Sequence, residues 1–266
     1  MLSTEKKFNL AFNIFLVTGM IVAVTITTIF KLQQPEVKTF MLLLAAFGST
    51  MGVVNTVLSA NGHILTFVFG LLDVLVATVV CYDNGIMGNF ALHAFYFLPM
   101  QFIGFWQWRK RGAAIGSAHQ EDTKVRARRL TGRQWVWLVC GVLVGIAVLY
   151  LVLYYVDVAK LDSGKITSVN KPKILLDAVV MALNIAGQVL LSFAFMEQWY
   201  IWILVNISSI SLWSVALLSG SGSGNAAVML IKYIFYLMNS LNGLRIWLNL
   251  CKQPEAVRPL TTNLDN

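Results

Sequence analysis

Long apolar stretches alternate with short polar segments along almost the whole chain. Eight stretches are each about 20 residues long, the length that an α-helix needs to cross the ~30 Å hydrocarbon core of a bilayer. A membrane β-barrel would instead show shorter segments in which apolar and polar residues alternate, and the sequence lacks them. We therefore predict an all-α integral membrane protein with eight transmembrane helices. The predicted spans are 8–30, 39–59, 63–82, 87–108, 134–156, 174–195, 199–218 and 226–248.

Composition excludes the water-soluble classes of protein. Of 266 residues, 58% are hydrophobic and only 12% are charged, whereas soluble domains carry about 25% charged residues. A net charge of +8 is compatible with nucleic-acid binding, but the basic residues flank the apolar spans, which is typical of membrane orientation. Cys81, Cys140 and Cys251 are far apart and match no metal-binding spacing. We expect no nucleic-acid partner and no metal.

The distribution of basic residues predicts which way the spans point. With eight spans, both termini and the 109–133 loop lie on one side of the membrane. That side carries twelve Lys and Arg residues, eight of them in the loop, and the opposite side carries six. The positive-inside rule therefore places both termini in the cytoplasm. The loop also suits binding to anionic lipid, although orientation is the favoured role.

Two segments of the chain resemble each other. The stretch "YFLPMQFIGFWQW" (96–108) aligns with "FYLMNSLNGLRIW" (235–247), and Leu98/Leu237, Gly104/Gly243 and Trp108/Trp247 are identical pairs. Spans 2 to 4 and spans 6 to 8 are therefore predicted to be parallel triple-helix repeats, an arrangement that places a transport site between the copies. The predicted organisation is an added N-terminal helix (1–36), a first repeat (37–108), a basic cytoplasmic loop (109–133), a linker helix (134–156), an external loop (157–172), a second repeat (173–250) and a cytoplasmic tail (251–266).

Polar side chains within the spans indicate where a binding site lies, because such residues are costly in lipid and normally face the protein interior. Trp199, Trp202 and Asn206 are spaced i, i+3, i+7 and share one helix face. Amides offer uncharged hydrogen-bonding groups and indoles offer flat apolar faces, which together suit a small, flat, polar molecule. The candidate binding residues are Trp202, Asn206, Trp199, Asn184, Gln188, Gln101, Asn239, His93 and Tyr96.

Several of these residues have a second interpretation. Trp199 suits an interfacial aromatic belt as well as a site, and Asn206 suits a hydrogen bond between helices. Asp177 and Lys232 are candidates for a structural ion pair, which we favour over a proton relay. Asp73 is the best single candidate for proton coupling. His93 suits a satisfied interior position equally well.

Catalytic patterns are absent from the sequence. "GSGSGN" (220–225) follows an apolar span and lacks the Lys of a phosphate-binding loop, so it is interpreted as an external turn. Neither a nucleophile elbow nor a zinc-binding helix motif occurs. We expect neither an enzyme nor a cofactor.

Two motifs resemble the PnuC family of vitamin transporters: Glu197 followed by W-x-x-W-x-x-x-N (Trp199, Trp202, Asn206), and "QFIGFWQWRKRG" (101–112), where an aromatic helix end continues into a basic loop. The likeness covers about residues 10–250. It implies a fold related to the SWEET sugar transporters, with a 3+1+3 arrangement of helices and one added N-terminal helix. It also implies a homotrimer in the bacterial inner membrane, and substrate contact by the motif Trp and Asn residues.

The resemblance further implies facilitated diffusion of nicotinamide riboside by alternating access, followed by trapping through a cytosolic kinase. A pyridinium ring suits stacking on Trp202, and a carboxamide and a ribose suit the amides. Thiamine is also flat and cationic, so transport of thiamine or of another nucleoside-like vitamin is the alternative. A further, less favoured alternative is a membrane receptor that binds such a molecule without transporting it.

Overall fold

The protein is a bundle of long helices. The computed structural model describes residues 4–33, 38–83, 87–115, 123–165, 167–218 and 225–252. The predicted turn at 220–225 and tail at 251–266 fall almost entirely outside these residues. The elements are α1 (Thr4–Leu32), α2 (Thr39–Ala60), α3 (Thr66–Asp83), α4 (Met87–Leu92), a π-helical turn η1 (His93–Phe97), α5 (Leu98–Lys110), α6 (Gly132–Asp162), α7 (Lys171–Ser192), α8 (Gln198–Leu218) and α9 (Asn225–Leu250).

Each predicted span coincides with a helix, and α4, η1 and α5 follow one another without a break and cover the fourth span. The widened turn η1 comes just before Pro99, the second residue of α5. A proline within a helix cannot donate to the carbonyl four residues earlier, and its ring crowds that carbonyl. The helix accommodates this by the wider π-helical turn.

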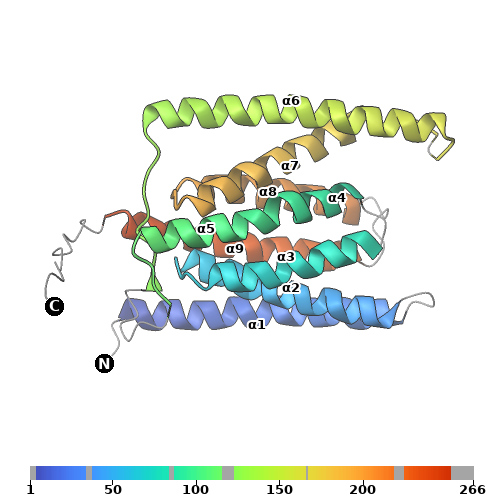
Figure 1. Ribbon diagram of the computed structural model, residues 1–266. Coiled ribbons are helices and arrows are strands. Elements are labelled where there is room, and N and C mark those ends of the chain that lie inside the picture. Colours follow the sequence, from blue (N-terminus) through green and yellow to red (C-terminus); the bar gives the residue numbers. More distant parts are fainter. Residues whose placement is uncertain are drawn as a thin grey trace, which may run out of the picture.

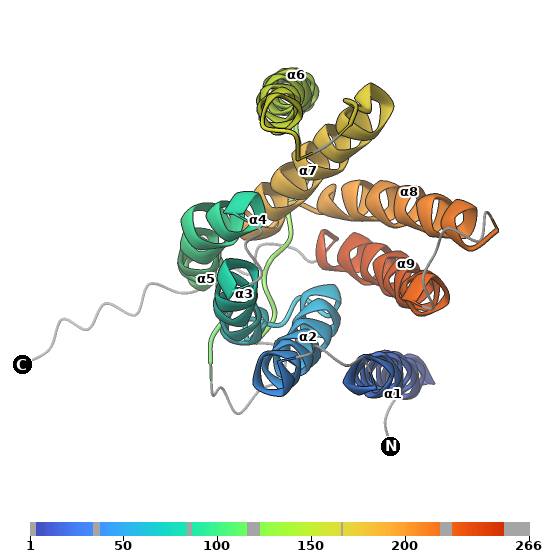
Figure 2. The ribbon, with the colours of Figure 1, turned by 90° about the vertical axis from the view of Figure 1, so that its right-hand side faces the viewer.

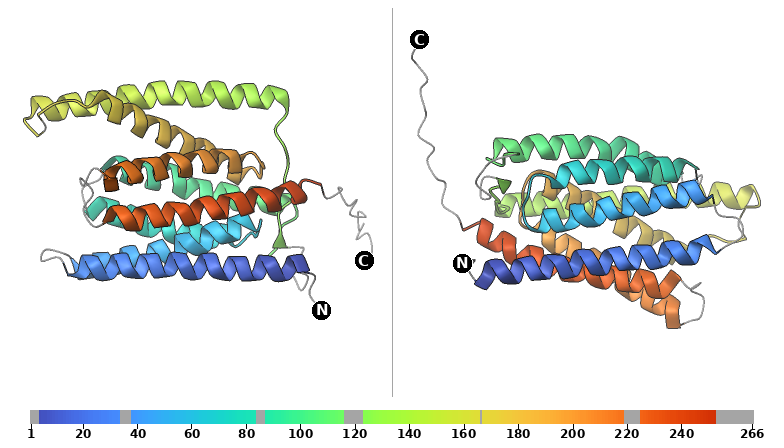
Figure 3. Two further views of the ribbon diagram at one scale, coloured as in Figure 1. Left: turned by 180° about the vertical axis from the view of Figure 1, so that it is seen from behind. Right: turned by 90° about the horizontal axis from the view of Figure 1, so that it is seen from below.

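The helices lie side by side along one direction, and α1 begins at the end of the bundle where α9 ends (Figure 1). We call this the basal end and the opposite one the distal end. Helix α1 packs against α2 and α9, as the two views of Figure 3 also show. Helix α6 lies apart from the bundle and packs mainly against α7 (Figure 2). The start of α1 and the end of α9 therefore both lie at the basal end.

The outer surface of the bundle is apolar. By length and composition, five helical stretches qualify as membrane spans among the described residues: Lys7–Leu32, Thr39–Ala60, Thr66–Asp83, Gly132–Asp162 and Ile174–Ser192. Large apolar side chains point outward from them, for example Phe30 of α1, Phe40 of α2 and Val144 of α6. Such a surface is stable in lipid and unstable in water.

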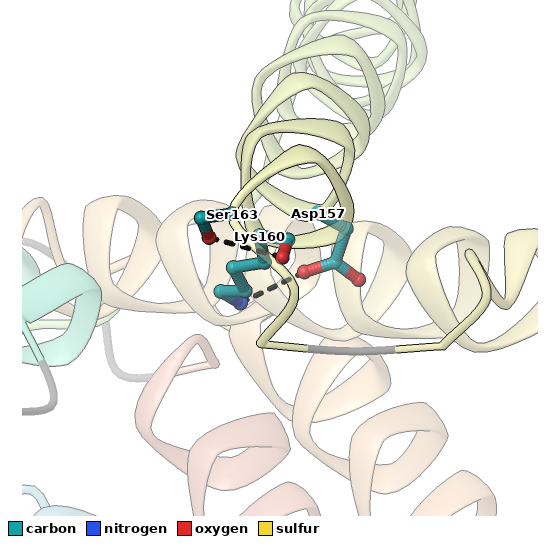
Figure 4. A network of polar contacts seen from close by, with 3 residues as sticks. All are labelled: Asp157, Lys160 and Ser163. Carbon is teal, nitrogen blue, oxygen red and sulfur yellow. Dashed lines mark hydrogen bonds and ion pairs between the residues drawn. The ribbon is translucent and has the colours of Figure 1, made fainter.

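Helix α6 is longer than the predicted span 134–156 at both ends. At its start, the Thr131 hydroxyl accepts a hydrogen bond from the Gln134 N–H, and the Gln134 side chain accepts one from the Thr131 N–H, which is a capping box. At its end, Lys160 forms an ion pair with Asp157 at 2.8 Å, and the Ser163 hydroxyl donates to the Lys160 carbonyl (Figure 4). The capping box and the Ser163 hydrogen bond satisfy backbone groups at the two helix ends. Apolar patterning does not detect such contacts, so the predicted span was shorter than the helix.

Four aromatic rings fill the basal end of the bundle. Phe67, Trp108, Trp199 and Trp247 are each 3% exposed or less, and we call them the aromatic cluster. Ring centroids lie 4.9 Å apart for Phe67 and Trp108, 5.6 Å for Trp108 and Trp247, and 6.1 Å for Trp199 and Trp247. Rings in such tilted contacts contribute about 0.5–1.5 kcal/mol beyond the burial of their area.

Two indole hydrogen bonds anchor this cluster to helix ends. Trp108 of α5 donates to the Leu191 carbonyl near the end of α7 at 2.9 Å. Trp247 of α9 donates to the Ser59 carbonyl near the end of α2 at 3.0 Å. Trp108 and Trp247 are one of the pairs that align in the sequence comparison, and their bonds are equivalent.

The segment 123–131, here called the strap, crosses the basal end. On one side it meets the loop between α2 and α3, where the Ile64 N–H donates to the Thr123 carbonyl at 3.1 Å and the Val125 N–H donates to the Gly62 carbonyl at 2.9 Å. These bonds form an isolated β-bridge between His63 and Lys124. The predicted basic loop therefore contains an ordered part.

On the other side the strap meets the loop between α7 and α8. The Arg128 N–H donates to the Ala194 carbonyl, and the Met196 N–H donates to the Arg128 carbonyl, both at 2.9 Å. The Arg128 guanidinium also donates to the Phe193 carbonyl and lies 3.9 Å from the centroid of the Phe195 ring. The strap thus binds two basal loops that are far apart in the sequence.

Acid pH should lower stability through His63, which lies in the loop between α2 and α3, before the described span Thr66–Asp83. Burial, and secondarily the charge of Lys124, lower the pKa of His63 below its ordinary 6.5, and its Nδ1 accepts a hydrogen bond from the Leu65 N–H at 3.2 Å. Below pH 6.5 the imidazole binds a proton more readily in the unfolded chain than in the folded protein, so the free energy of unfolding falls as the pH is lowered. The His63→Gln variant should lose less stability between about pH 7.5 and about pH 5.5 than the wild type, as thermal unfolding in detergent would measure. Equal losses in the two proteins would contradict this.

Candidate functional site

A cavity of about 350 Å³ lies between α2, α3, α7, α8 and α9. It extends from the aromatic cluster toward the distal end, since it is lined by Trp199 at the base of α8 and by Lys232 near the distal start of α9. Its lining residues are Ser49, Gly52, Asn55, Thr56, Ser59, Asp73, Val180, Asn184, Gln188, Leu191, Trp199, Trp202, Val205, Asn206, Ser209, Lys232, Tyr233, Tyr236, Asn239 and Ser240.

Helix α8 contributes the face predicted from its sequence. Trp199, Trp202 and Asn206 all line the cavity, one above the other, and Ser209 continues the row by one turn. A Cβ on Gly187 of α7 would lie 2.9 Å from the Trp202 indole, so α7 presses closely on that ring. The indole therefore packs against α7 and also lines the cavity.

Trp199 lies at the base of the cavity. It is 3% exposed, contacts Trp247, and approaches α9 so closely that a Cβ on Gly243 would lie 2.6 Å from the ring. A belt residue would face lipid at the membrane surface. The burial of Trp199 therefore favours an interior position over the belt. Its indole N–H is buried and has no hydrogen-bond acceptor among the described residues.

The predicted amides divide their hydrogen bonds between neighbours and the cavity. Asn206 donates to the Ser240 hydroxyl of α9 at 2.9 Å, so it bonds a neighbouring helix and also lines the cavity. Asn239 donates to the Thr56 carbonyl at 3.0 Å, while its own carbonyl oxygen is buried and accepts nothing from the described residues. Asn184 donates within its own helix, to the Val180 carbonyl. Asn206 and Asn184 each keep a side-chain oxygen to which no described residue donates, and a bound molecule can use it.

Three predicted residues do not line the cavity. The Tyr96 hydroxyl donates to the Ile185 carbonyl of α7 at 2.7 Å. His93 contacts the Asn89 carbonyl at 2.8 Å within its own helix. Gln101 is 6% exposed and lies over Gly70, where a Cβ would be 2.5 Å from its side-chain oxygen. These polar groups serve helix packing in this structure.

The structure does not bring Asp177 and Lys232 together. Asp177 is exposed on α7, whereas Lys232 lines the cavity and lies 5.4 Å from the Tyr236 ring centroid. Among the described residues, ion pairs join Lys38 to Asp83 and Lys160 to Asp157. The predicted structural ion pair is therefore absent among them, and the acidic group within electrostatic reach of Lys232 is Asp73.

Sequence reasoning missed the small residues that α2 contributes to the cavity. Ser49, Gly52, Thr56 and Ser59 line the cavity, and their spacing of i, i+3, i+7, i+10 is that of one helix face. These residues are small and only weakly polar, so a search for amides, aromatics and charges passes over them. A search for small polar residues at helical spacing would have found them.

An all-helical bundle with an apolar outer surface and a polar cavity within it defines a multi-pass membrane protein that can hold a small polar molecule at the depth of the bilayer. Residues 42–249 match the sequence model of the family described as "Nicotinamide mononucleotide transporter". The chain is 34% identical to the nicotinamide riboside transporter PnuC of Neisseria mucosa over 79% of its own length and 73% of that protein. It is 28% identical to the PnuC of Haemophilus influenzae over 79% and 81% of the two chains.

A solved structure is also similar. The crystal structure of the vitamin B3 transporter PnuC superposes with a TM-score of 0.62 at 28% identity, and the match covers 95% of this chain and 93% of that one. The chain therefore belongs to the PnuC family of bacterial membrane transporters. It is a transporter and not an enzyme.

The contact between Trp199 and Gly243 gives a prediction about stability. In the Gly243→Ala variant the new Cβ would lie 2.6 Å from the Trp199 ring, so the indole has to move and the aromatic cluster has to repack. Overpacking of this kind costs about 1–3 kcal/mol. Thermal unfolding in detergent should therefore occur at a lower temperature than in the wild type.

The matched control is Gly141→Ala on α6, where nothing lies within 4 Å of a new Cβ. Because alanine favours a helix over glycine, this variant should be as stable as the wild type or slightly more so. Equal destabilisation by the two substitutions would show that the contact between Trp199 and Gly243 does not determine stability.

Proposed function

We propose that this protein transports nicotinamide riboside across the bacterial inner membrane. The observation that carries the proposal is the cavity wall on α8, where Trp202 and Asn206 face a space lined by further amides. Nicotinamide riboside combines a cationic aromatic ring, a carboxamide and a ribose. Stacking of the ring on an indole contributes about 0.5–2 kcal/mol through cation–π attraction, and the amides are complementary to the carboxamide. The names of the relatives support the same substrate.

The cavity favours the riboside over the mononucleotide for which the family is described. A phosphate adds nearly two negative charges at neutral pH. Lys232 is the sole cation among the described residues that line the cavity, and Asp73 faces the same space. Phosphate sites normally use several donors, such as a bidentate Arg or a helix N-terminus.

Thiamine is the alternative substrate, because it is also flat and cationic. Titration calorimetry with nicotinamide riboside, the mononucleotide, thiamine and a neutral nucleoside decides between them. We expect nicotinamide riboside to bind most tightly. A receptor without transport activity is the other alternative, and it would bind substrate but show no counterflow of labelled substrate in vesicles.

Transport is proposed to proceed by alternating access between two triple-helix repeats, α2 to α5 and α7 to α9, joined by α6 and preceded by the added helix α1. This is the 3+1+3 arrangement implied by the likeness to SWEET transporters. The equivalent indole bonds of Trp108 and Trp247 support it. So do Gly62 and Ala194, which hold equivalent places in the two basal loops and have φ angles of 68° and 59°.

Both termini are proposed to be cytoplasmic, which makes the basal end the inner end. The basic residues of 109–133 lie toward that end, as the positive-inside rule requires of a cytoplasmic loop. The aromatic cluster and the strap then close the cavity toward the cytoplasm. A homotrimer is proposed from the family likeness, and the open apolar face of α6, which has no buried residue among those described, offers a surface for it.

The proposed transport is passive, with a cytosolic kinase that phosphorylates the substrate and so maintains its gradient. Proteoliposomes without the kinase should therefore equilibrate labelled nicotinamide riboside and not accumulate it. Imposing a proton or a sodium gradient should leave the final internal concentration unchanged. Accumulation above the external concentration under either gradient would contradict the passive mechanism.

Substitution of Trp202 tests the stacking role. Trp202→Ala should weaken binding of nicotinamide riboside by ~1–3 kcal/mol, the range for aromatic stacking on bases, which is a factor of about 5–150 in Kd. The control is Trp137→Ala, whose side chain is 68% exposed on α6 and should bind with wild-type affinity. Calorimetry measures both. Unchanged affinity in Trp202→Ala would show that the indole only packs against α7.

A further inference from the structure

Two charged side chains line the cavity, and the proposed function leaves both without a role. Asp73 lies on α3 and Lys232 on α9, and the other described lining residues are uncharged at neutral pH. Charged groups at the depth of a bilayer are costly and usually serve binding or transport. Their positions therefore carry information about the substrate.

The carboxylate of Asp73 is held at the cavity wall by a close approach to α2. A Cβ on Gly52 would lie 2.8 Å from its Oδ2 atom, so a larger residue there would displace the carboxylate. Thr66 donates to Asn55 nearby, but Asp73 accepts no hydrogen bond from the described residues and its oxygens are not enclosed. An ionised carboxylate can accept about four hydrogen bonds, and here they are open to the cavity.

Lys232 lies close enough to Asp73 for an electrostatic interaction but does not form an ion pair with it within 4.0 Å. Its ammonium group lies beside the Tyr236 ring and leaves the acceptor positions of Asp73 unoccupied. The charge of the carboxylate is therefore partly balanced, while its hydrogen-bonding capacity is not used.

Asp73 and Asn206 lie at the same depth. Helices α3 and α8 both start at the basal end; Asp73 is seven residues beyond the first residue of α3, and Asn206 is eight beyond that of α8. At 1.5 Å per residue, both are about 10–12 Å from the basal helix ends. The two helices stand on different sides of the bundle (Figure 2), and Asp73 and Asn206 line the same cavity, so a molecule bound there lies between them.

We propose that the Asp73 carboxylate accepts hydrogen bonds from the vicinal hydroxyl groups of the substrate's ribose and that Lys232 balances its charge. Carboxylates bind ribose hydroxyls in this way in dinucleotide-binding proteins. Asp73 then determines specificity, because it favours ring compounds that carry a vicinal diol over flat cations that lack one, such as thiamine. This inference rests on the proposed function.

The experiment is titration calorimetry of the full-length protein with nicotinamide riboside and with its 2′,3′-dideoxy analogue. The wild type should prefer nicotinamide riboside by about 10–100-fold, the factor that corresponds to a hydrogen bond with a charged partner. Asp73→Asn should lose most of that preference, mainly by weaker binding of the riboside. Asp177→Asn, which changes an exposed aspartate of α7 outside the cavity, should retain it.

A second variant keeps the inference testable if Asp73→Asn does not fold. Gly52→Ala keeps the carboxylate but displaces it, because the new Cβ would lie 2.8 Å from Oδ2, and it should lower the preference by weakening binding of the riboside more than binding of the dideoxy analogue. Equal affinity of the wild type for the two ligands would overturn the inference, as would equal weakening of both ligands by Asp73→Asn. A wild type that binds thiamine but neither of these ligands would instead overturn the proposed function.

Discussion

The indole N–H groups of Trp108 and Trp247 require acceptors at a place that water does not reach, since both side chains are fully buried. Each finds a carbonyl in the last turn of another helix, Leu191 in α7 and Ser59 in α2, where carbonyls lack the usual partner four residues later. The two bonds fix α5 to α7 and α9 to α2. Trp199 then packs against Trp247 and forms the base of the cavity. The position of the site thus depends on bonds at the basal end.

The helices could be predicted from the sequence because lipid requires about 20 apolar residues for each span. The face of α8 could be predicted because Trp202 and Asn206 are costly in lipid and have to face inward. The same reasoning placed Tyr96 in the site, but Tyr96 does not line the cavity in this structure. A polar group within a span can be satisfied by a neighbouring helix, as the Tyr96 hydroxyl is by the Ile185 carbonyl. Polarity alone does not distinguish these two outcomes.

The strap could not be predicted, because its contacts are made by the backbone and by residues distant in sequence. In the sequence, Arg128 is only one of the basic residues from which the membrane orientation is predicted. In the structure its guanidinium donates to the Phe193 carbonyl and stacks on Phe195, and its backbone pairs with Ala194 and Met196. Burial, and secondarily the charge of Arg111, lower the pKa of Arg128. Keeping the guanidinium charged at this place therefore costs free energy, which its contacts offset. Counting basic residues along the sequence does not reveal these contacts of Arg128.

The strap constrains the motion that the proposed alternating access would require. In the proposed arrangement, the loop of Gly62 belongs to one repeat and the loop of Ala194 to the other, and the strap is bonded to them at Val125 and Arg128. These two anchors are three residues apart, so a fully extended chain separates them by only about 10 Å. Opening the basal end within that distance can leave all four backbone bonds intact. A wider opening has to break the pair of bonds at one anchor, and two neutral backbone bonds contribute only about 1–3 kcal/mol. The strap therefore permits a wide opening at a cost that substrate binding can offset.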